Sequence, residues 1–116
     1  MPRSLFAVIM IAIAALAPAP AALAADCTGF VVNVRPIEQY NPARGSGFLA
    51  VRTGPGTRHD QIGELYAGDE VSVLERQGNW YLVRCVAGRC TDPLRGNPRP
   101  VGWSFHRYLN VFGNCP

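Results

Sequence analysis

Apolar residues after position 25 fall in short runs that are separated by turns rich in glycine and proline. The clearest run, residues 70–76, alternates polar and apolar side chains for most of its length, as a strand with one buried face does. Residues 77–79 form a tight hairpin connection, and no stretch sustains a helical period. The runs that predict strands are 30–34, 48–52, 61–66, 70–76, 80–85, 101–104 and 109–112. The chain is therefore predicted to be all-β.

The regular spacing of these strands, in a chain of this length, predicts a small, partly open barrel of five to six strands. Alternation places Val71, Val73, Tyr81 and Val83 on one face of two paired strands, where they can form the core. Residues 106–108, between the last two strands, can form one 3₁₀ turn.

The first 24 residues have the order of a secretory signal peptide. A positively charged start at Arg3 is followed by the apolar run 5–16 and then by small residues broken by prolines. This apolar run is shorter than the roughly 20 residues that span a bilayer as a helix. Small residues at Ala22 and Ala24 predict cleavage after Ala24, with Ala25 as the second choice. We therefore expect an exported protein, periplasmic or secreted.

An uncleaved membrane anchor is the alternative to a signal peptide. Pro18 and Pro20 count against it, because proline breaks a helix. Attachment of a lipid would require a cysteine directly after the small residues, and Asp26 intervenes before Cys27. We expect no membrane attachment once the signal is removed.

The chain has four cysteines, Cys27, Cys85, Cys90 and Cys115. An even count in an oxidising compartment indicates two disulfides, which a domain this small needs as staples. The sequence alone does not choose between the three pairings. Local geometry favours Cys85–Cys90, across a gap that can turn, and Cys27–Cys115 would then tie the chain ends. Two cysteines with four residues between them, and the other two far away in the chain, are poor zinc spacing, so we expect no metal site.

The mature chain has a nearly balanced charge. All eleven basic residues are arginines, and removal of Arg3 with the signal leaves ten against eight acidic residues. This near balance does not indicate nucleic-acid binding, which needs a strongly basic face. Arginine without lysine suits the bidentate recognition of carboxylates.

Five motifs stand in order across about sixty residues. They are LAVRTGPGT at 49–57, IGEL at 62–65, GDEVSVL at 68–74, GNWYLV at 78–83, and GW at 102–103 followed by RYL at 107–109. Together they resemble the bacterial SH3 domain family (SH3b, SH3-like). The resemblance implies an SH3-like barrel that targets cell-wall peptidoglycan or its peptide stems.

The resemblance also divides the chain. The expected parts are a signal peptide at 1–24, an N-terminal strand and long loop at 25–47, an SH3-like domain at 48–112, and a tail at 113–116. Two features depart from the family pattern: the loop insertion at 86–100 and the N-terminal strand with its long loop. Both are expected beside the region where SH3-type barrels bind ligands.

No residue pattern supports catalysis. A cysteine nucleophile needs a free thiolate near a histidine, and every cysteine has a candidate disulfide partner although His59 and His106 are present. Asp69 and Glu70 are expected in a solvated turn, and no serine lies in a nucleophile-elbow pattern. We expect a protein that is not an enzyme and has no cofactor.

Aromatic and arginine side chains are the candidate binding groups. An exposed tryptophan beside an arginine can stack on a sugar ring or peptide and pair with a carboxylate. The alternative is that Trp80 and Trp103 only close the end of the barrel. The candidate ligand-binding residues are Trp80, Arg84, Trp103, Arg107, Tyr108 and Arg52.

Two functions follow from these features. The first is a non-catalytic exported module that binds peptidoglycan or its peptide stems. The second is a periplasmic protein-interaction or inhibitor protein, which would use the disulfide-anchored loop 86–100 as its contact surface. We expect a monomer in either case.

Overall fold

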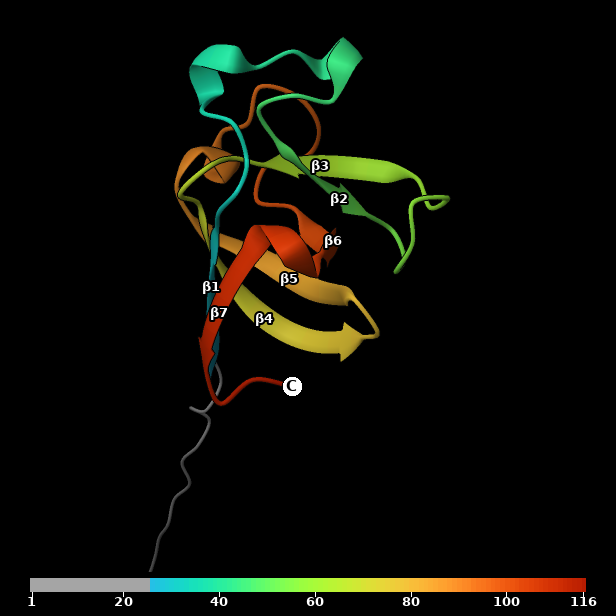
Figure 1. Cartoon of the computed structure of the whole chain (residues 1–116), viewed down its shortest axis with the longest axis vertical. Coiled ribbons are helices and arrows are strands. Elements are labelled where there is room, and N and C mark those ends of the chain that lie inside the picture. Colours follow the sequence, from blue (N-terminus) through green and yellow to red (C-terminus); the bar gives the residue numbers. More distant parts are fainter. Residues whose placement is uncertain (1–25) are drawn as a thin grey trace, which may run out of the picture.

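A computed structural model describes residues 26–116 as one antiparallel sheet of seven strands (Figure 1). The strand order is β3-β2-β6-β5-β4-β1-β7, and the sheet forms an SH3-like barrel that is not closed. The strands are β1 (Cys27–Val31), β2 (Leu49–Arg52), β3 (Gln61–Leu65), β4 (Glu70–Gln77), β5 (Trp80–Ala87), β6 (Val101–Phe105) and β7 (Leu109–Gly113). The 3₁₀ turns are η1 (Ile37–Gln39), η2 (Pro42–Arg44), η3 (Arg89–Thr91) and η4 (His106–Tyr108). The expected all-β, partly open barrel is confirmed.

The core is built from the inward faces of the central strands. Val71 and Val73 of β4 pair with Cys85 and Val83 of β5, and all four are buried. Tyr81 is buried with them, so alternation along the sequence identified the inward face correctly. A β-bulge after Val73 ends the buried half of β4, and residues 74–79 at the tip of the β4–β5 hairpin are exposed.

The N-terminal strand differs from its prediction. β1 covers Cys27–Val31 instead of residues 30–34, and just beyond it Asn33 has a left-handed backbone (φ 59°) that no strand accommodates. β1 lies between β4 and β7 and pairs with both. It is therefore part of the barrel rather than a lead-in to it, which is why the strand count exceeds five to six.

All four cysteines are paired. Cys27 is bonded to Cys115 and Cys85 to Cys90, the pairing that the spacing favours. Two disulfides are compatible with an exported protein. The signal peptide expected at 1–24 lies outside the described residues. Between residues 26 and 116, no helix has the length and apolar character needed to cross a membrane.

Asp69 holds the insertion 86–100 to the barrel. Its carboxylate accepts hydrogen bonds from the backbone N–H groups of Tyr66 (2.8 Å), Arg89 (2.7 Å) and Cys90 (3.0 Å). Asp69 is 2% exposed, so the expectation of a solvated turn is wrong for this residue. Burial raises the pKa of the Asp69 carboxyl above its usual value, against the opposing effect of the three hydrogen bonds. Asp69 is buried because the insertion packs over it, while Ala67 and Gly68 of the same turn stay exposed.

A second buried carboxylate links the N-terminal loop and the insertion 86–100 to the edge strand β3. Glu64 is 2% exposed and accepts hydrogen bonds from the hydroxyls of Tyr40 (2.9 Å) and Tyr66 (2.5 Å). The Tyr66 oxygen also accepts a hydrogen bond from the backbone N–H of Leu94 in the insertion (2.9 Å). The N-terminal loop and the insertion therefore meet at one end of the barrel (Figure 1), where they cover an edge that would otherwise be open.

This cluster predicts a loss of stability at alkaline pH. Burial, followed by the hydrogen bond and charge of Glu64, raises the pKa of Tyr66 above its usual 10.0. Because the phenol ionises more readily in the unfolded chain, its contribution to stability is complete below about pH 10 and is lost as the pH rises further. We expect Tm to fall as the pH rises above about 10, and to fall less in Tyr66→Phe. Thermal unfolding followed by circular dichroism measures the slope of Tm against pH for the wild type and for Tyr66→Phe. Equal slopes in the two proteins would contradict the prediction.

Candidate functional site

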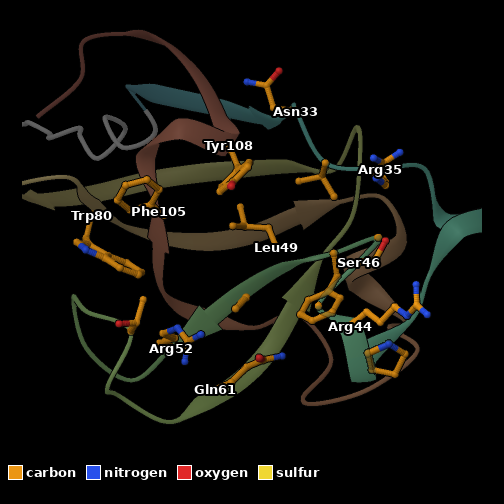
Figure 2. A pocket seen from close by; sticks show the side chains of 17 residues that line it. Asn33, Arg35, Arg44, Ser46, Leu49, Arg52, Gln61, Trp80, Phe105 and Tyr108 are labelled. Carbon is orange, nitrogen blue, oxygen red and sulfur yellow. The ribbon is translucent and has the colours of Figure 1, made fainter.

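A groove of about 730 Å³ lies between the N-terminal loop, strand β2 and the segment from β6 to η4 (Figure 2). Its volume is in the range of sites that hold small molecules or short peptides. The lining residues are Asn33, Val34, Arg35, Pro42, Arg44, Gly45, Ser46, Gly47, Phe48, Leu49, Ala50, Arg52, Thr57, Gln61, Trp80, Phe105 and Tyr108.

Three aromatic side chains form one wall of the groove. Trp80 begins β5 and lies directly opposite Phe105 at the end of β6, with ring centroids 5.3 Å apart in an edge-to-face arrangement. Tyr108, on η4, continues the wall with its ring centroid 6.3 Å from that of Phe105. All three side chains are half-buried, so part of each ring stays accessible. Figure 2 shows Leu49 between this wall and the arginines.

Three arginines and no carboxylate are among the described residues that line the groove. Arg52 donates one N–H to the His59 carbonyl (3.0 Å), and Arg35 donates one to the Gln39 side chain (3.2 Å). A guanidinium has five N–H donors, so both keep donors for a ligand. With Arg44 as the third arginine, the groove presents positive charge that suits a carboxylate held by two parallel hydrogen bonds.

The turn η2 determines where Arg44 stands. The Asn41 side chain accepts a hydrogen bond from the backbone N–H of Ala43 (3.1 Å), and Pro42 supplies the first residue of the turn. Gly45 ends the turn with a left-handed backbone (φ 67°), which glycine adopts without strain. The local sequence Asn-Pro-Ala-Arg-Gly therefore presents the arginine at the rim of the groove.

The structure brings half of the candidate ligand-binding residues together. Those that line the groove are Trp80, Arg52 and Tyr108. Arg84 is exposed on the outer face of β5 opposite Val101, and Arg107 is exposed on η4; neither lines the groove. Trp103 is 9% exposed and pairs with Leu82 and Arg52 in the sheet, which leaves it little surface for a ligand.

Sequence reasoning did not propose Arg35 and Arg44 as binding residues. Both lie in the irregular loop between β1 and β2, where no periodicity tells which way a side chain points. Their only signal was the expectation that this loop lies beside the ligand-binding region. The arrangement as a whole can bind an anionic group next to a flat or apolar one.

The described domain is similar to known proteins over about half of the chain. A family model described as bacterial SH3 domain matches residues 47–110. Bacteriocin BCN5 of Clostridium perfringens is 32% identical over 59 residues, which are 51% of this chain and 5% of that much longer protein. No solved structure matches the chain.

Proposed function

Because the chain belongs to the bacterial SH3 domain family, we propose that it is a non-catalytic exported module that binds cell-wall peptidoglycan through its peptide stems. The observation that carries the proposal is the groove, in which an aromatic wall stands beside three arginines. Stem peptides have free carboxylates for the arginines and flat peptide or sugar surfaces for the rings. Such binding needs no cofactor and no second subunit.

The direct test is sedimentation of the mature protein with isolated sacculi. We expect the bound fraction to be larger at low ionic strength than at physiological salt, because salt screens the attraction between arginines and carboxylates. The face is tested by Trp80→Ala and Arg44→Ala, one from the aromatic wall and one from the rim. Each substitution is expected to lower the apparent affinity for sacculi about tenfold, because a central aromatic or charge-assisted contact is lost.

Two matched controls come from outside the groove. Phe112 is an exposed aromatic residue on β7, and Arg84 is an exposed arginine on β5. We expect Phe112→Ala and Arg84→Ala to sediment as the wild type does. Equal losses in Arg84→Ala and Arg44→Ala would show that the groove is not the binding face, and failure of the wild type to sediment at either ionic strength would overturn the proposal.

A protein-interaction role for the insertion is the second candidate, and exposed apolar surface on the insertion supports it. Leu94 is 42% exposed, although the backbone around it is held by Tyr66. Its test is capture of a partner from periplasmic extract by the wild type and not by Leu94→Asp. Leu74 on the β4–β5 hairpin is 38% exposed, so Leu74→Asp is a control of similar exposure. Equal capture by all three proteins would exclude this role.

A further inference from the structure

A second hollow, of about 350 Å³, adjoins the groove. Pro42, Phe48 and Gln61 line both spaces, so the two lie next to each other on the surface. Gln61 is seen at one side of the groove in Figure 2. The other residues that line the hollow are Ile62, Gly63, Glu64, Arg95 and Gly96.

The hollow is built by the N-terminal loop, by the edge strand β3 and by the insertion. The backbone N–H of Asn97 donates a hydrogen bond to the Ile62 carbonyl (3.0 Å), which fastens the insertion to β3. Gly96 approaches so closely that a Cβ added to it would lie 2.9 Å from the Gly63 Cα. The walls of the hollow are therefore held in place before any ligand arrives.

Glu64 contributes a buried carboxylate to the hollow. Both of its oxygens accept from the same Tyr40 hydroxyl, and Oε1 also accepts from Tyr66. A carboxylate has about four acceptor positions, so among the described residues Oε2 has capacity left. Neutral hydroxyls stabilise the charge but do not cancel it, and a buried charge favours a cationic partner.

Arg95 contributes positive charge to the same hollow. It is exposed, and it belongs to the insertion 86–100. Burial and Glu64 raise the pKa of Tyr40 while the charge of Arg95 lowers it, which indicates that the guanidinium acts on the tyrosine–glutamate cluster. The hollow thus combines one anionic and one cationic side chain.

We propose that the second hollow binds the zwitterionic head of an α-amino acid, with the ammonium at Glu64 and the carboxylate at Arg95. An ammonium offers N–H donors to the unfilled Glu64 oxygen, and a guanidinium pairs with a carboxylate. The volume is sufficient for an amino acid with a short side chain. A peptide in the groove reaches this site only through a side chain that ends in both an ammonium and a carboxylate, because a peptide terminus carries just one of the two; that connection rests on the proposed function, while the amino-acid site does not.

Titration of the mature protein with alanine, followed by NMR, tests the site. We expect millimolar alanine to shift the backbone amide signals of Gly63 and Gly96. N-acetylalanine lacks the ammonium and alaninamide lacks the carboxylate, so each is expected to bind at least about tenfold more weakly. Absence of shifts at Gly63 and Gly96, or equal binding of N-acetylalanine, would overturn the proposal.

Two variants test which side chain recognises the carboxylate of the ligand and which recognises its ammonium. Arg95→Ala is expected to abolish discrimination against alaninamide, whereas Arg99→Ala, a second exposed arginine of the insertion that does not line the hollow, should bind as the wild type does. Glu64→Gln is expected to abolish discrimination against N-acetylalanine; its fold is checked from the dispersion of its amide signals. Retained discrimination in folded Arg95→Ala overturns the proposal even if Glu64→Gln does not fold.

The amino-acid site and the proposed function fail independently. One outcome is that the protein sediments with sacculi, and less so as Trp80→Ala, while alanine causes no shift at Gly63. In that case the second hollow is not an amino-acid site and the groove proposal stands. If alanine binds with the expected discrimination but sacculi do not sediment the protein, the peptidoglycan proposal fails and the hollow remains an amino-acid site.

Discussion

Replacing Cys27 and Cys115 together by alanine is expected to lower the free energy of unfolding by about 4.6 kcal/mol. The two cysteines are 88 residues apart, and cross-linking so long a loop removes a large conformational entropy from the unfolded chain. Domains are stable by about 5–15 kcal/mol in total, so this loss would be a large fraction of the stability. Urea unfolding of the oxidised wild type and of the variant measures the difference.

The second disulfide is the internal control for this effect. Cys85 and Cys90 are separated by 5 residues, and the same entropy argument gives a loss of about 2 kcal/mol for their double replacement by alanine. The critical result is which of the two double variants loses more unfolding free energy. If removal of the short-range disulfide destabilised the protein as much as removal of Cys27–Cys115, loop entropy would not explain the stability.

Replacing Asp69 by alanine is expected to cost about 3 kcal/mol of stability at pH 7. The change leaves three backbone N–H groups, those of Tyr66, Arg89 and Cys90, without their acceptor, and each buried unpaired donor costs about 1–3 kcal/mol. Removing a carboxylate whose pKa is raised by burial offsets part of this loss, because its ionised form is costly in the folded state. Urea unfolding measures the stability, and hydrogen exchange of the Cys90 amide reports whether the insertion has been released.

Asp92→Ala is the matched control for Asp69→Ala. Asp92 is an exposed aspartate of the same insertion, and substitutions at such positions change stability by less than about 0.5 kcal/mol. A loss below about 1 kcal/mol in Asp69→Ala, or an unchanged exchange rate at Cys90, would show that other contacts hold the insertion.

The fold was predictable wherever a strand has one buried face and a clear period. Residues 70–76 and 80–85 alternate, so their pairing and the burial of Val71 and Tyr81 followed from the sequence. The family resemblance is confirmed by the match over residues 47–110. β1 was misplaced by three residues, because Thr28 and Gly29 give a weak strand signal and acquire their strand geometry from pairing with β4 and β7.

The candidate site was predictable only in part. Trp80 and Tyr108 belong to motifs with a definite place in the barrel, and both line the groove. Arg44 reaches the groove through a loop whose path depends on the Asn41 cap and on the contact between Tyr40 and Glu64. The contact between Tyr40 and Glu64 joins residues far apart in the sequence, and no local sequence pattern predicts such a contact.

Strand period and turn composition act over a few residues, so the sequence alone predicts a small all-β domain of SH3-like type with four cysteines suited to two disulfides. The packing of distant segments places β1 within the sheet and brings the N-terminal loop to the insertion over β3. It also buries Asp69 and Glu64, which look like surface acids. The burial of a polar group depends on which distant segments supply its hydrogen bonds, and those segments come together only in the folded chain.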